Sequence, residues 1–255
     1  MFISDEQWEV LGPILERPRK SQYGRPRANE REAFEAILFV LHTGIQWKYL
    51  PRTFPPKSTV HDYLKGWSQS DVFRKILAAI ISNLIDEGRV SLDQCFIDAT
   101  FAAAKGGGEC VGLTRKGKGT KLQLIVDKKG VPLALSIDSA GVGETSMVQQ
   151  TLGFNDETAN PRRLIGDQGY DSDALDQTLA ELGIEMIAPN RSNRSQTQDR
   201  RPLRRYRHRW VVERTIAWLQ NHRRLLVRHE KHASLFAAFA TLGCLMIALR
   251  HLPLA

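Results

Sequence analysis

The stretch "GTKLQLIVDKKGVPLALSIDSA", residues 119–140, carries the clearest structural signal in this chain of 255 residues. Two apolar runs flank the tetrapeptide "DKKG" (127–130), and a polar turn with glycine between two strand-like runs is typical of a β-hairpin. We therefore expect two antiparallel strands that turn at Asp127. This hairpin is the reference point from which the neighbouring segments can be placed.

The segments on either side of the hairpin predict an α/β fold. The run "SLDQCFIDAT" (91–100) before it has the pattern of a short strand, and helices and strands alternate after it. A basic loop and a last helix, which carries Glu213, complete the pattern. The predicted order is β-β-β-α-β-α-β-α, in which the segments after the hairpin are 144–154, 162–170, 171–183, 184–190 and the helix around Glu213.

The first 90 residues or so predict helices and no strands. Ser4 is a suitable N-cap, with Gln7 three residues later as in a capping box. Gly44 is placed to end a second helix, and Ser58 is placed to begin a third. A helix, a glycine-containing turn and a helix suggest a helix-turn-helix, although a plain helical bundle gives the same pattern.

The sequence pattern changes after Gly88 from helices alone to strands and helices, and we place a domain boundary there. Residues 1–88 are expected to form an all-helical, helix-turn-helix-like region, and residues 89–255 an α/β domain with C-terminal helices. Within the apolar stretch 233–252, the uninterrupted run between His232 and Arg250 is shorter than the roughly 20 residues that a membrane span needs, and the stretch is rich in alanine. We expect it to be a buried C-terminal helix, with no membrane partner.

Net charge, cysteine content and the first residues limit which partners and which compartment suit this chain, but they do not choose a single function. The formal net charge of +8 suits a polyanionic partner, either nucleic acid or an acidic membrane surface. Three scattered cysteines without a CxxC pair argue against a disulfide framework and fit a reducing compartment such as the cytoplasm. The acidic start "MFISDEQWEV" (1–10) lacks the basic and apolar regions of a signal peptide.

Two aspartates share a distinctive position at the carboxyl ends of predicted strands. Asp98 follows "CFI" and Asp167 follows "LIG". Ligands collect at the carboxyl ends of neighbouring strands, so the two carboxylates converge if these strands are adjacent. Paired carboxylates repel each other and are usually stabilised by a divalent cation, for which oxygen ligands favour Mg²⁺ or Mn²⁺. The alternative is that each Asp caps a turn, which is our interpretation of Asp127, Asp171 and Asp173.

A third acid, Glu213, lies in the basic stretch "RRYRHRWVVERTIAW" (204–218), and seven of the fifteen residues 200–214 are arginine. On a helix, Tyr206, Arg209, Glu213 and Gln220 fall on one polar face. Arg209 precedes Glu213 by four residues, so an exposed ion pair worth about 0.3–0.5 kcal/mol explains the pair without any active site. Helix geometry alone leaves both interpretations open.

The whole constellation resembles a known family. Acids on the first strand, the fourth strand and the last helix match the layout of RNase H-like nucleotidyl transferases. Nearly the entire chain is similar to DDE transposases of bacterial insertion sequences, of the insertion sequence five type. The family signature of Tyr, two residues, Arg, three residues, Glu, six residues and Lys matches at Tyr206, Arg209 and Glu213, whereas Gln220 replaces the Lys.

The resemblance implies a metal-dependent enzyme that acts on DNA. Its metal ligands would be Asp98, Asp167 and Glu213, holding two Mg²⁺ ions, with Mn²⁺ as the alternative. Such a site activates a water or a DNA 3′-hydroxyl for in-line attack on phosphorus. The family acts at the terminal inverted repeats of its element and then joins the ends to target DNA. The helical region would bind those repeats, within a homodimer or a larger synaptic complex.

Basic residues around this site are candidates for DNA contact. The segment "GLTRKGKG" (112–119) is close to a phosphate-binding loop, but it lacks the required Ser or Thr and precedes a strand where a helix is needed. We interpret it as a flexible basic loop near DNA, with a solvated surface loop as the alternative. The candidate DNA-binding residues are Tyr206, Arg209, Lys116, Lys118, Lys121, Arg191 and Arg194.

Two other functions remain open at this point. One is a transposase-derived DNA-binding regulator that has lost catalysis, against which the three intact acids argue. The other is a metal-dependent nuclease without strand transfer, which the sequence does not exclude.

Overall fold

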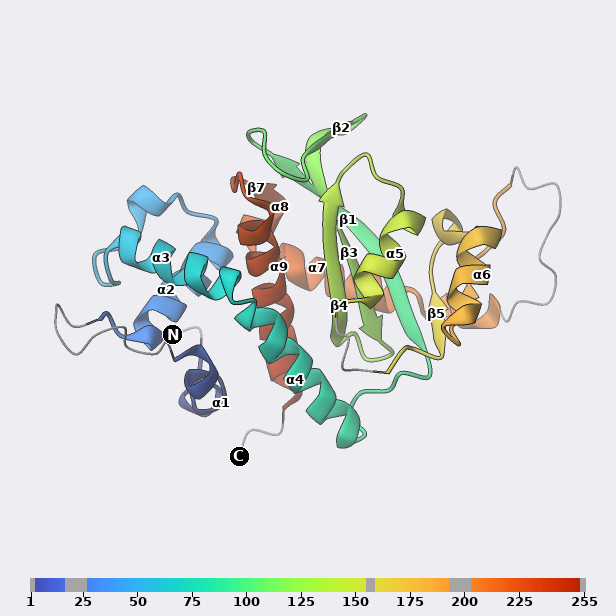
Figure 1. Cartoon of the computed structure of the whole chain (residues 1–255), viewed down its shortest axis with the longest axis horizontal. Coiled ribbons are helices and arrows are strands. Elements are labelled where there is room, and N and C mark those ends of the chain that lie inside the picture. Colours follow the sequence, from blue (N-terminus) through green and yellow to red (C-terminus); the bar gives the residue numbers. More distant parts are fainter. Residues whose placement is uncertain (1–2, 17–26, 155–158, 193–202, 253–255) are drawn as a thin grey trace.

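The computed structural model describes residues 3–16, 27–154, 159–192 and 203–252. Helices α1 (Asp5–Leu15), α2 (Glu30–Thr43) and α3 (Lys57–Gln69) lie at one end, and α4 (Val72–Asp86) runs from there to below the sheet (Figure 1). A mixed sheet occupies the middle, and α6 (Asp173–Glu181) lies at the other end. This is the mixed sheet with flanking helices, preceded by a helical region, that the sequence predicts.

The sheet has antiparallel and parallel parts. β1 pairs antiparallel with β3 and parallel with β5, so it lies between the hairpin part and the α/β part of the sheet. The strand order is β2-β3-β1-β5-β6, with β4 also paired to β3 and β7 to β1. The strands are β1 (Cys95–Ala104), β2 (Gly112–Thr114), β3 (Gly117–Asp127), β4 (Pro132–Ser139), β5 (Arg163–Ile165), β6 (Glu185–Ile187) and β7 (Val227–Arg228).

The hairpin predicted for residues 119–140 is confirmed as β3 and β4. Its turn depends on Asp127, because the Oδ1 atom of this residue accepts hydrogen bonds from the backbone N–H groups of Lys129 and Val131. The interpretation of residues 112–119 as a flexible loop is wrong. These residues form β2 and the start of β3, joined by a tight turn at Gly117, whose positive φ of 99° suits glycine.

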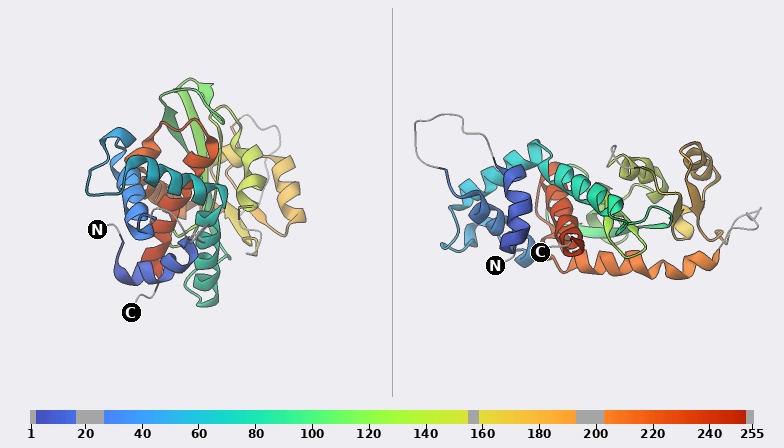
Figure 2. Two further views of the ribbon diagram at one scale, coloured as in Figure 1. Left: turned by 60° about the vertical axis from the view of Figure 1, so that its left-hand side comes forward. Right: turned by 90° about the horizontal axis from the view of Figure 1, so that it is seen from below.

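Helices cover both faces of the sheet. α5 (Glu144–Leu152) packs on β3 and β4, and α7 (Trp210–Gln220) packs on β1 and β3 from the opposite side (Figures 1 and 2). The short α8 (Arg223–Leu226) follows α7. The site described below forms where α5, α7 and the carboxyl end of β5 approach the middle of β1.

The helical region consists of α1 (Asp5–Leu15), α2 (Glu30–Thr43), α3 (Lys57–Gln69) and α4 (Val72–Asp86). The capping box of Ser4 and Gln7 is present, and Gly44 ends α2 with a φ of 68°. Ser58 is not the cap that we expected, because α3 already begins at Lys57, after Pro56. Proline at the N-cap sets the chain direction without a side-chain hydrogen bond.

The apolar C-terminal helix α9 (Ala233–Ala248) lies between the helical region and the sheet (Figure 1). It packs on α3 and α4 on one side and on β4 on the other. Residues 233–251 are long and apolar enough to cross a membrane, but 72% of the most apolar stretch is buried inside the protein. A helix covered on several sides in this way is apolar around most of its circumference.

Candidate metal centre

Asp98 and Asp167 come from neighbouring strands. β5 pairs with β1 only at Cys95 and Phe96 and ends at Ile165. Asp98 therefore lies two residues beyond the last residue of β1 that pairs with β5, beside the segment in which Asp167 leaves the sheet. The expectation that Asp98 lies at the carboxyl end of its strand is wrong, because β1 continues to Ala104 through its pairing with β3 and β7. The predicted adjacency of these two strands is confirmed, and it brings the two carboxylates together as expected.

The turn after β5 fixes the Asp167 side chain. Asp167 is the N-cap of a short 3₁₀ helix, Gln168–Tyr170, and its Oδ1 atom accepts a hydrogen bond of 2.7 Å from the backbone N–H of Gly169. A Cβ at position 169 would lie 2.7 Å from that oxygen and 3.3 Å from the Oε2 atom of Glu144. Glycine therefore keeps the space between these two carboxylates open.

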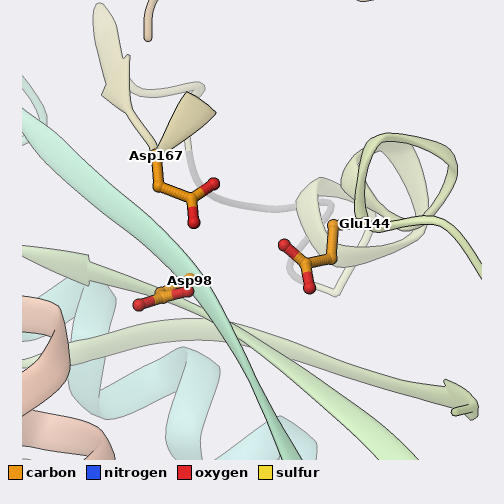
Figure 3. Close-up of side chains that lie close together, drawn as sticks. All are labelled: Asp98, Glu144 and Asp167. Carbon is orange, nitrogen blue, oxygen red and sulfur yellow. The ribbon is translucent and has the colours of Figure 1, made fainter. Parts of the chain in front are cut away.

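A third acid, Glu144, completes the group. One carboxylate oxygen from each of Asp98, Glu144 and Asp167, which we call the acidic cluster, lies within 4.8 Å of the others. Figure 3 shows the three side chains pointing toward one another from β1, α5 and the turn after β5. All three residues are partly buried. The sequence predicts the helix that carries Glu144, but we did not single out this residue.

A buried hydrogen-bond network holds α5 over this site. The side-chain amide of Gln123, a fully buried residue of β3, donates to the backbone oxygen of Glu144 at 2.8 Å and to the hydroxyl of Tyr170 at 3.1 Å. The hydroxyl of Thr151, near the other end of α5, donates to the Oε1 atom of Gln123 at 2.6 Å. One side chain thus fixes both ends of α5 and the turn after Asp167.

Burial and neighbouring negative charge both raise the pKa of groups at this site. Burial raises the pKa of Asp98, and the negative charge of Asp167 raises it further, against the hydrogen bond from Ala99 and the charge of Arg209. The pKa of the buried Tyr170 is raised by burial first and then by the charge of Glu144. Both shifts are those expected where negative charge is concentrated in a partly buried site.

Arg209 lies between Asp98 and Glu213. Its Nη1 atom donates to the Oδ2 atom of Asp98 at 2.7 Å, and its Nη2 atom donates to the Oε1 atom of Glu213. The Glu213 side chain is 52% exposed, whereas that of Asp98 is 17% exposed. The structure thus brings Asp98 and Asp167 together with Glu144. Glu213 lies outside this cluster and is linked to Asp98 through the guanidinium of Arg209. The role of Glu213 as a metal ligand stays a prediction.

The candidate DNA-binding residues lie in different surroundings. Lys116 and Lys118 are exposed around the β2–β3 turn. Lys121 is only 17% exposed and lies 3.4 Å from a carboxylate oxygen of Glu144. Arg191 donates to the backbone oxygens of Gln168 and Gly169 and thereby braces the turn beside Asp167.

Of the remaining residues of the expected signature, Tyr206 lies beside Arg209 and Gln220 contacts β1. Its guanidinium lies 5.8 Å from the ring centre of Tyr206, and the Gln220 side chain donates to the hydroxyl of Thr100 on β1 at 3.0 Å. Arg194 lies outside the described residues. Asp171 and Asp173, both expected to cap a helix, do not cap α6: Asp171 accepts the backbone N–H of Arg191, and the cap is Ser172, after which Asp173 is the first helical residue.

The donor set suits a hard divalent cation. The acidic cluster offers only carboxylate oxygens, the ligands that Mg²⁺ and Mn²⁺ prefer, and Gly169 leaves room among them. Within the described part of the chain, these are the acidic, His or Cys side chains that lie close enough together to share an ion.

Comparison with known families decides what kind of protein carries this site. The family described as "Transposase DDE domain" matches residues 91–249, more than half of the chain. The chain belongs to the DDE transposases. A second family, described as "Putative transposase of IS4/5 family", matches residues 3–77, so the type of family that the sequence indicated is confirmed.

Two relatives come from Burkholderia cepacia. The "Putative transposase for insertion sequence element IS402" is 42% identical over 87 residues, which are 34% of this chain and 38% of that protein. The "Insertion element IS402 uncharacterized 16.2 kDa protein" is 29% identical over 118 residues, which are 44% of this chain and 80% of that protein. The chain thus matches well under half of the length of the first relative.

The fold is similar to that of a solved transposase. The structure described as "Cryo-EM structure of piggyBac transposase synaptic complex with hairpin DNA (SNHP)" aligns with a TM-score of 0.54 and 9% identity. The alignment covers 95% of this chain and 71% of that chain. The predicted RNase H-like sheet with flanking helices is therefore confirmed.

Proposed function

We propose that this transposase cleaves DNA at the ends of its insertion sequence and joins those ends to target DNA, with a divalent metal ion as cofactor. The observation that carries the proposal is the convergence of Asp98, within β1, and Asp167, just after the carboxyl end of β5, inside a DDE transposase domain. In the part of the chain that the structure describes, these side chains offer oxygen ligands in the pattern that metal-dependent phosphoryl transfer requires.

The proposed metal ligands are Asp98, Asp167 and Glu213. Two bound Mg²⁺ ions, or Mn²⁺, would activate the attacking water or 3′-hydroxyl and stabilise the leaving oxygen. Arg209 pairs with two of the three acids, and its guanidinium can instead contact a DNA phosphate. We propose that DNA takes over this guanidinium, which releases Asp98 and Glu213 for the ions.

The proposed DNA surface follows from charge and position. The net charge of +8 suits the phosphate backbone, and Lys116 and Lys118 project from the β2–β3 hairpin. The proposed contacts beyond these two are Tyr206, Arg209, Lys121, Arg191 and Arg194. We further propose that residues 1–88 bind the terminal inverted repeats and that residues 89–255 form the catalytic unit, in a homodimer or larger synaptic complex in the bacterial cytoplasm.

A joining assay tests this proposal and separates it from its alternatives. The full chain is incubated with Mg²⁺, a target plasmid and labelled duplexes taken from the two ends of the element. We expect nicked duplex and labelled plasmid. Binding without nicking would instead support a regulator, and nicking without labelled plasmid would support a nuclease.

Glu213→Gln tests the metal ligand that lies apart from the acidic cluster. We expect it to lower cleavage by at least about a hundredfold, since loss of a group that stabilises the transition state commonly costs 3 kcal/mol or so. Glu181→Gln, which also removes an exposed helical carboxylate, is the matched control and should keep wild-type activity. Full cleavage by Glu213→Gln would show that the assignment is wrong.

A further inference from the structure

Glu144 is an acid that the three proposed ligands do not include. It is the first residue of α5, and one of its carboxylate oxygens lies within 4.8 Å of those of Asp98 and Asp167. We propose that Glu144 is a further ligand of the divalent ion at this site, so that α5 as well as β1, β5 and α7 supplies the metal centre. The inference rests on the proposed metal-dependent function.

The charge around the cluster calls for a cation. The acidic cluster and Glu213 carry four negative charges, and the side chains paired with them, Arg209 and Lys121, carry two positive ones. Two negative charges remain, which is the amount that one divalent ion balances. Like charges this close in a partly buried site are costly unless such a cation neutralises them.

Lys121 does not take up the Glu144 carboxylate fully. Its ammonium group lies 3.4 Å from the Oε1 atom of Glu144, longer than the 2.7–2.9 Å or so of a strong charged hydrogen bond. The same ammonium donates to the backbone oxygen of Val142 at 2.7 Å. Lys121 therefore reduces repulsion within the cluster, while the Glu144 carboxylate keeps ligand capacity toward Asp167 (Figure 3).

The backbone that carries the Glu144 side chain is held by a buried hydrogen bond before any ion binds. Its backbone oxygen accepts the hydrogen bond from the buried Gln123, which also binds the Tyr170 hydroxyl beside the Asp167 turn. Gly169 keeps the space between Glu144 and Asp167 clear of a side chain. Ligands held by buried hydrogen bonds in this way are typical of organised metal sites.

The test measures ion binding directly on the full chain, without DNA. Mn²⁺ is titrated by calorimetry into wild type, Glu144→Gln and Glu30→Gln. Glu30 is the first residue of α2, as Glu144 is of α5, so the control removes the same charge from the same helix position. We expect Glu144→Gln to weaken Mn²⁺ binding at least about tenfold, and Glu30→Gln to stay within about twofold of wild type.

A second readout separates ligation from charge at a distance. The luminescence lifetime of bound Eu³⁺ in H₂O and D₂O counts the waters on the ion, and loss of a protein ligand adds about one water. We expect that extra water in Glu144→Gln and none in Glu30→Gln. Lys121→Met should tighten Mn²⁺ binding severalfold, because it removes the cation beside Glu144.

The failures of this inference and of the proposed function are distinguishable. If Asp98→Asn loses Mn²⁺ binding while Glu144→Gln keeps wild-type affinity and water count, Glu144 is not a ligand and the metal centre stands without it. A Glu144→Gln protein that binds more weakly but has an unchanged water count also overturns the ligand assignment. If Asp98→Asn binds Mn²⁺ as wild type does, the metal centre itself is wrong.

Discussion

Arg209 joins two acids for which we propose one function. Its guanidinium donates to Asp98 and to Glu213, and its side chain is only 18% exposed. A partly buried ion pair of this kind opposes the entry of another cation, because the two compete for the same carboxylate. The same guanidinium, which hydrogen-bonds to Asp98, could instead bind a DNA phosphate.

Replacing Arg209 should therefore move two measurements in opposite directions. We expect Arg209→Met to tighten Mn²⁺ binding to the free protein by about threefold or more, because a competing cation is removed. We expect DNA cleavage to fall at least about tenfold, since one charge-assisted contact is worth about 1.5 kcal/mol or more. Calorimetry and a single-turnover cleavage assay measure the two effects.

Arg207→Met is the matched control for Arg209→Met. Arg207 is an exposed neighbour of the same residue type, and its Nε atom donates to His208. It should leave Mn²⁺ binding unchanged. Weaker Mn²⁺ binding by Arg209→Met would contradict the idea that the guanidinium and the ion compete for Asp98.

Single residues show what the sequence could and could not predict about the site. Asp98 and Asp167 could be identified because each follows a short apolar run in the sequence, although β1 continues past Asp98 to Ala104. Glu144 was missed because its relation to them depends on how α5 packs on the sheet, which no local pattern encodes. The available signal was an acid in the first turn of a helix directly after a strand. Gln220, which stands where the family has Lys, donates a hydrogen bond to Thr100 on β1.

At the scale of elements, α5 depends on Gln123. This buried amide bonds to the Glu144 backbone, to the Tyr170 hydroxyl and to Thr151, and it lies on β3 in the middle of the sheet. Buried polar groups that lose such a partner have neither water nor protein to hydrogen-bond with, which lowers the free energy of unfolding. The helix and the turn beside Asp167 therefore share a single anchor.

Gln123→Leu should weaken both the fold and the metal centre. We expect the free energy of unfolding in urea to fall by about 2 kcal/mol, because the partners of the amide stay buried and unpaired. We also expect severalfold weaker Mn²⁺ binding, because α5 is no longer held over Asp167. Gln150→Leu, on the exposed side of α5, should change neither quantity. Unchanged Mn²⁺ affinity in a destabilised Gln123→Leu would show that the network is structural only.

Elements with strong local signals were predicted well. The hairpin turn at Asp127, the capping box at Ser4 and the helix end at Gly44 all depend on hydrogen bonds or φ angles set within a few residues. The wrong predictions concern elements whose bounds depend on contacts between distant residues or on two competing local signals. Residues 112–119 belong to an edge of the sheet because β3 begins at Gly117, before its apolar part, and pairs there with β2. Helix α3 begins at Lys57, one residue before Ser58, because Pro56 is its N-cap.

At the scale of the whole molecule, the helical region and the sheet share one buried helix. α9 contacts α3, α4 and β4, and α8 adds a buried ion pair between Arg224 and Glu230, with 2.7 Å between Nε and Oε1. Arg224 also donates to the backbone oxygen of Ile45, beyond α2. The sequence predicted a buried C-terminal helix from its composition, but it could not predict that this helix would join two regions.

The proposed DNA-binding surface is the part of the molecule that the sequence predicts least directly. The positive net charge indicates a polyanionic partner, but the basic residues have several different roles in the structure. Lys121 faces an acid and Arg191 braces a turn, whereas Lys116 and Lys118 are exposed. The division into residues 1–88 and 89–255 and the synaptic assembly remain proposals.

The central claim is that Asp98 and Asp167 hold the divalent ion of this transposase. Anomalous diffraction from crystals of the full chain grown with Mn²⁺ tests it most directly, because the signal locates the ion independently of activity. We expect the strongest anomalous peak within about 2.5 Å of carboxylate oxygens from both residues. A strongest peak elsewhere on the molecule, with none between Asp98 and Asp167, would contradict the claim.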